Sequence, residues 1–60
     1  MIAKERALNI IQKALGDPFI KEDRKRELFN LYKEIEDAKT IDASIDHRVN
    51  EVLKEQEEQA

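Results

Sequence analysis

The chain has 60 residues, of which 40% are hydrophobic, 42% are charged and 5% are aromatic. It holds one glycine, one proline and no cysteine, and 11 basic and 14 acidic residues give a formal charge of −3. This length allows one domain, 1–60. The missing cysteines exclude disulfides, cysteine zinc sites and thiol catalysis, and one glycine with one proline cannot supply the turns of an all-β fold.

The high charge does not predict disorder, because the two signs nearly cancel and 18 large apolar residues recur with a helical period. No apolar run approaches the ~18 residues that are needed to span a bilayer. The first residues lack the basic-then-apolar order of a signal peptide. We therefore expect a folded, helical, cytoplasmic protein without a membrane span.

The first predicted helix covers 2–15. Its apolar residues lie on one face that is wide enough to contact two neighbouring helices. Gly16 suits the left-handed position that ends many helices, and Asp17-Pro18 stops the helix because proline disfavours helical geometry in the residue before it. The residues of the wide face are Ala3, Ala7, Leu8, Ile10, Ile11, Ala14 and Leu15.

A loop or short turn is predicted over 16–21. Phe19 and Ile20 are apolar, whereas the seven residues of 21–27 are all charged. A helix that began at Pro18 would expose two turns without a buried side. We expect Phe19 and Ile20 either to close one end of the core or to contact a partner.

The second predicted helix covers 23–39. Leu28, Leu31, Tyr32, Ile35 and Ala38 form a stripe at i, i+3, i+4 spacing, as in an amphipathic helix. Phe29 lies beside this stripe, so the sequence leaves open whether it belongs to the core or to an interface.

The third predicted helix covers 42–57, with Thr40, Asp42 or Ser44 as its cap. Its stripe consists of Ile41, Ile45, Val49, Val52 and Leu53. The sequence therefore predicts an all-α, three-helix bundle.

One alternative is a helical hairpin with a single long helix over 22–58. This stretch has no glycine or proline, and its apolar residues from Leu28 to Val52 keep one heptad register. Such a hairpin would form a dimeric, coiled-coil-like bundle.

No enzymatic chemistry is predicted. The single glycine excludes glycine-rich phosphate loops and a nucleophile elbow. Ser44 and His47 resemble part of a catalytic triad in residue type only, and the Asp-rich 42–46 lacks the glycine of a calcium loop. We expect no catalytic residue, no cofactor and no metal.

Nucleic acid is an alternative partner. Lys21, Arg24, Lys25 and Arg26 are the possible contacts, but Glu22, Asp23 and Glu27 alternate with them. Seven basic and five acidic residues give 1–30 a net charge of +2, whereas four basic and nine acidic residues give 31–60 a net charge of −5. The acidic balance argues against phosphate binding by the whole surface, which leaves only a basic helix start for an accessory role.

The preferred function is a non-enzymatic protein–protein interaction as a regulator, inhibitor or adaptor. A 60-residue domain buries only about 60% of its unfolded surface, so self-association, most simply as a dimer, would add stability. The predicted partner-binding residues are Phe19, Ile20, Phe29 and Tyr32.

The layout also resembles that of the small helical immunity proteins that protect bacteria from their own bacteriocins. They share an amphipathic first helix, a charged loop with Asp17-Pro18 and antiparallel helices. This chain is short for their fourth helix. The resemblance implies, as a further alternative, an immunity-type role.

Overall fold

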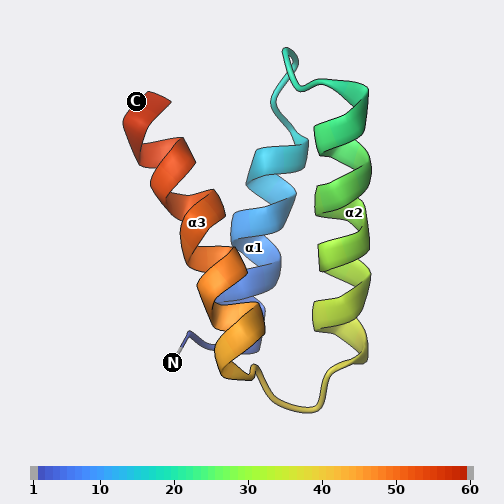
Figure 1. Ribbon diagram of the computed structural model, residues 1–60, viewed down its shortest axis with the longest axis vertical. Coiled ribbons are helices and arrows are strands. Elements are labelled where there is room, and N and C mark those ends of the chain that lie inside the picture. The colour runs from blue at the N-terminus through green and yellow to red at the C-terminus, as the bar shows by residue number, and fades with distance from the viewer. Residues whose placement is uncertain (1, 60) are drawn as a thin grey trace.

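The computed structural model describes residues 2–59, which form three α-helices and contain no strand. These are α1 (Lys4–Leu15), α2 (Glu22–Asp37) and α3 (Ala43–Gln59). Figure 1 shows α1 between the other two, with α2 antiparallel to it and α3 diverging from α2 toward the C-terminus. The predicted all-α, three-helix bundle is confirmed, and every helix begins and ends within two residues of its predicted bounds.

The core lies along α1, which packs against both other helices, whereas α2 and α3 contact each other less. The wide apolar face of α1 explains this arrangement, because it serves two neighbours at once. Ile11, Ile35 and Val49, one from each helix, are completely buried. The buried apolar residues are Ala7, Ile10, Ile11, Leu28, Leu31, Ile35, Ile41, Ile45, Val49 and Val52.

The alternative of one long helix over 22–58 is wrong. At Ala38 the backbone is extended, with φ −76° and ψ 137°, so α2 ends at Asp37. Asp42 then starts α3, because its Oδ1 accepts a hydrogen bond of 2.8 Å from the backbone N–H of Ile45. The apolar residues from Leu28 to Val52 that keep one heptad register therefore belong to two separate helices, α2 and α3, and face the core from each.

We expect the substitution Asp42→Ala to lower the free energy of unfolding by about 1 kcal/mol, the usual value for an N-cap. The reason is that the Ile45 N–H loses its acceptor and the N-terminus of α3 loses a favourable negative charge. Thermal unfolding of the two proteins measures the difference. Asp42→Ser is the matched control and should retain most of the stability, so an equal loss in both variants would contradict the capping role.

Gly16 ends α1 without the left-handed geometry that the sequence suggested. Its φ of −80° and ψ of −3° are right-handed, and its N–H donates to the carbonyls of Gln12 and Lys13. The prediction of a left-handed Gly16 is therefore wrong: the chain keeps a helical turn here and changes direction only at Asp17-Pro18.

This geometry predicts that Gly16→Ala stabilises the protein by about 0.4–1 kcal/mol, because alanine has less backbone freedom to lose on folding. A Cβ at this position would lie 3.5 Å from the Lys13 carbonyl oxygen and 3.6 Å from that of Gln12, which are ordinary contacts. Denaturant unfolding measures the gain. A destabilised Gly16→Ala protein would show that the local backbone differs from the one described.

None of the three helices has the length and apolar character that crossing a membrane requires, as judged over residues 2–59.

Candidate functional site

A tight turn connects α1 to α2 and fixes the position of Phe19. The Ile20 N–H donates to the Asp17 carbonyl at 3.2 Å, and the Phe19 N–H donates to Asp17 Oδ1 at 3.0 Å. Pro18, with its fixed φ, occupies the second position of this turn. Phe19 has no positive φ, so the turn is of type I, since type II requires a positive φ at its third residue.

Phe19 is 90% exposed and does not close the end of the core. The alternative in which Phe19 closes the core is wrong, because the ring at the third position of the turn is exposed to solvent. Ile20, at the fourth position, is half-buried and packs against the core. Of the two residues, only Ile20 contributes to closing this end of the bundle.

A hollow of about 550 Å³ lies beside this turn, between the start of α2 and the end of α3. We call it the end hollow. Ala14, Leu28 and Val52 supply apolar lining from the three helices, and Ile20 adds to it from the turn. Phe19 also lines it, and its high exposure places the ring at the edge. Figure 1 shows that α3 diverges from α2 toward this end of the bundle.

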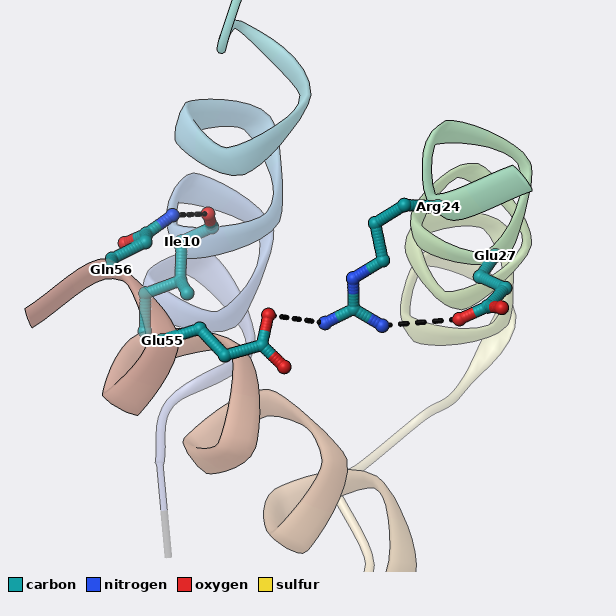
Figure 2. A network of polar contacts seen from close by, with 5 residues as sticks. All are labelled: Ile10, Arg24, Glu27, Glu55 and Gln56. Atoms are coloured by element: carbon teal, nitrogen blue, oxygen red, sulfur yellow. Dashed lines mark hydrogen bonds and ion pairs between the residues drawn. The ribbon is translucent and has the colours of Figure 1, made fainter. Parts of the chain in front are cut away.

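Arg24 carries the ionic contacts of the end hollow (Figure 2). One of its Nη atoms lies 2.7 Å from a carboxylate oxygen of Glu55 on α3, and the other lies 3.1 Å from one of Glu27 on α2. Arg24 and Glu55 also line a second hollow, of about 490 Å³, further along α2 and α3. Their ion pair therefore connects the two helices where apolar packing between them is sparse.

The last turns of α3 are attached to α1 by Gln56. Its Nε2 donates a hydrogen bond of 3.0 Å to the Ile10 carbonyl oxygen, as Figure 2 shows. Gln56 also lines the end hollow. This contact holds the α3 side of the hollow in place.

Two of the predicted partner-binding residues lie elsewhere. Phe29 is 51% exposed, with the Lys33 Nζ 5.2 Å from the centre of its ring, as in a cation–π contact. Tyr32 is half-buried, and its hydroxyl accepts a hydrogen bond of 3.2 Å from Gln12 Nε2. Neither lines the end hollow. The structure thus brings Phe19 and Ile20 together but separates them from Phe29 and Tyr32.

The four basic residues at the start of α2 also separate into two groups. Lys21 and Arg24 line the end hollow, whereas Lys25 and Arg26 are exposed and do not. Arg24 is engaged by Glu27 and Glu55, which leaves its charge largely neutralised.

Sequence reasoning missed Ala14, Lys13, Glu55 and Gln56 as residues of this site. Arg24 and Glu55 are 31 positions apart and Gln56 and Ile10 are 46 apart, so no local pattern relates them. The only sequence signal was indirect: an apolar pair in a loop beside a wide apolar helix face.

No protein-family model matches the chain, and neither a curated protein nor a solved structure is significantly similar to it.

Proposed function

We propose that this protein is a non-enzymatic interaction module that binds another protein at the end hollow, with Phe19 as its main anchor. It would act as a regulator, inhibitor or adaptor, by occupying a surface of its partner. We place this activity in the cytoplasm, in line with the absence of cysteine.

The observation that carries the proposal is the fixed outward display of Phe19. A single exposed aromatic residue is common on protein surfaces and is not evidence by itself. Phe19 differs because two hydrogen bonds and a proline hold its backbone, so little conformational entropy would be lost on binding. Large aromatic side chains are also the most frequent anchors of protein interfaces.

The surroundings of Phe19 also favour a protein interface. The end hollow combines apolar lining with charged side chains, which matches an interface with an apolar centre and a polar rim. Lys13, Lys21 and Asp17 line it from α1 and the turn, with a net charge of +1, and Glu55 lines it from α3. Such a pattern of charges would orient a partner rather than supply most of the affinity.

Site-specific photo-crosslinking in the native host tests this proposal. A photoreactive phenylalanine analogue replaces Phe19 in one protein and Phe29 in the matched control. Both positions are exposed aromatics, Phe19 in the turn before α2 and Phe29 in the middle of α2, but only position 19 lines the end hollow. We expect a discrete protein adduct from position 19 that is absent from position 29.

Two results would overturn the proposal. Equal adducts from positions 19 and 29 would mean that the partner binds by nonspecific apolar contact. If position 19 gives no adduct although the protein is folded and expressed, the end hollow is not a docking surface.

A further inference from the structure

We infer that the end hollow receives Phe19 of a second copy of this chain, so that two copies exchange their Phe19 side chains about a two-fold axis. This inference rests on the proposed function and names the partner of that same surface. Each copy would then complete the hollow of the other.

The first argument is self-complementarity. An isologous dimer needs one surface that carries both the protruding group and the cavity that accepts it. Here a 90% exposed phenylalanine lies at the edge of an apolar hollow of about 550 Å³ that its own ring leaves open. A two-fold axis that passes between Phe19 and the end hollow therefore places the Phe19 ring of each copy at the end hollow of the other copy.

The second argument is charge. On the α1 and turn side the end hollow is lined by Lys13, Lys21 and Asp17, with a net charge of +1, whereas Glu55 lines it from α3. Glu51 and Glu58 flank Glu55 on α3, close to one turn away in each direction, and both are exposed. The exchange of Phe19 brings the turn side of each copy to the α3 side of the other. Basic groups then face acidic groups twice, once at each half of the contact.

The third argument is surface area. The chain exposes 4638 Å², whereas about 4,100 Å² is expected for a compact monomer of its mass. A standard interface buries about 800 Å² per partner, about a sixth of the exposed surface of this chain. Because the exchange involves a single turn of each copy, we expect a weak dimer that forms at high protein concentration.

The chain has no tryptophan, so Phe19→Trp introduces a single fluorescent reporter at the contact. As the concentration of this purified variant rises from micromolar to millimolar, we expect its emission to shift to shorter wavelength, because the indole moves from water into the hollow. Phe29→Trp is the matched control and should keep an unshifted emission. An emission of Phe19→Trp that stays constant over this range, or an equal shift in both variants, overturns the inference.

A complementation experiment tests the exchange itself. Phe19→Asp removes the inserted ring and leaves the hollow, whereas Ala14→Met fills the hollow and leaves the ring. In sedimentation, each variant alone should associate about 1,000-fold more weakly than the natural chain, about 30-fold for each of the two symmetry-related contacts that its dimer loses. An equimolar mixture should regain association, because one of the two contacts can form. A mixture no more associated than its components overturns the exchange.

Far-UV circular dichroism shows whether Ala14→Met is folded. Should it unfold, the concentration series of Phe19→Trp alone decides the question.

The crosslinking experiment separates this inference from the proposed function. An adduct from position 19 with the mass of two chains supports both. An adduct with a different protein, together with an unshifted Phe19→Trp, supports the proposed function and overturns the second copy as occupant. An unshifted emission without any adduct overturns both.

Discussion

Replacing Ile11 by alanine is expected to lower the free energy of unfolding by about 2–5 kcal/mol, a large share of what a 60-residue chain has. Ile11 is completely buried on α1, the helix that packs against both others. A buried isoleucine-to-alanine change lowers the free energy of unfolding by about 2–5 kcal/mol, because contacts are lost and a cavity remains. A chain of this size has about 3–9 kcal/mol in total, so a substantial fraction of its stability is lost.

Urea unfolding, followed by circular dichroism at 222 nm, measures this effect. Ile11→Leu is the matched control, because it conserves the volume and should cost less than about 1.5 kcal/mol. An Ile11→Ala protein with a loss below 1 kcal/mol would mean that the three helices do not share the core described here.

Lys4→Met is expected to lower the free energy of unfolding by about 1–2 kcal/mol, more than its surface position on a short helix suggests. The Lys4 Nζ donates two hydrogen bonds of 2.8 Å, to the carbonyl oxygens of Glu36 and Ala38. These carbonyls belong to the C-terminal end of α2, whose last turn contains no basic residue of its own. Lys4 therefore supplies, from α1, the positive charge and the donors that the end of α2 lacks.

The control for this prediction is Lys54→Met, an exposed lysine on α3. Methionine conserves most of the aliphatic length of lysine in both variants, so the difference between them reports the capping interaction. Thermal unfolding should show Lys4→Met several degrees below Lys54→Met. Equal melting temperatures would show that the two hydrogen bonds contribute nothing net to stability.

The helices and their buried faces could be predicted because they depend on local spacing. The wide apolar stripe of α1 indicated two packing partners, and Asp17-Pro18 marked the first break. The second break was ambiguous, since the stripes of α2 and α3 happen to keep one heptad register. Only the capping hydrogen bond of Asp42 and the extended backbone of Ala38 decide it.

The candidate site could be predicted only in part. Phe19 and Ile20 were noticed as an apolar pair in a loop, but the direction of each side chain depends on the type of turn. The contact of Lys4 with the end of α2 could not be predicted, because its acceptors lie 32 and 34 positions away in the sequence. Such long-range contacts depend on how the helices pack against one another. The local spacing of apolar residues does not predict that packing.

The way in which α2 and α3 are joined has a consequence for solution conditions. Two partly exposed ion pairs connect them, Arg24 with Glu55 and Arg48 with Glu34. Both helices contact α1 mainly through the buried apolar core, together with the hydrogen bonds of Lys4 and Gln56. Salt screens exposed ion pairs and leaves apolar packing largely intact. We therefore expect the angle between α2 and α3, and with it the width of the end hollow, to vary with ionic strength. Even an uncharged ligand of this hollow would then bind with a salt-dependent affinity.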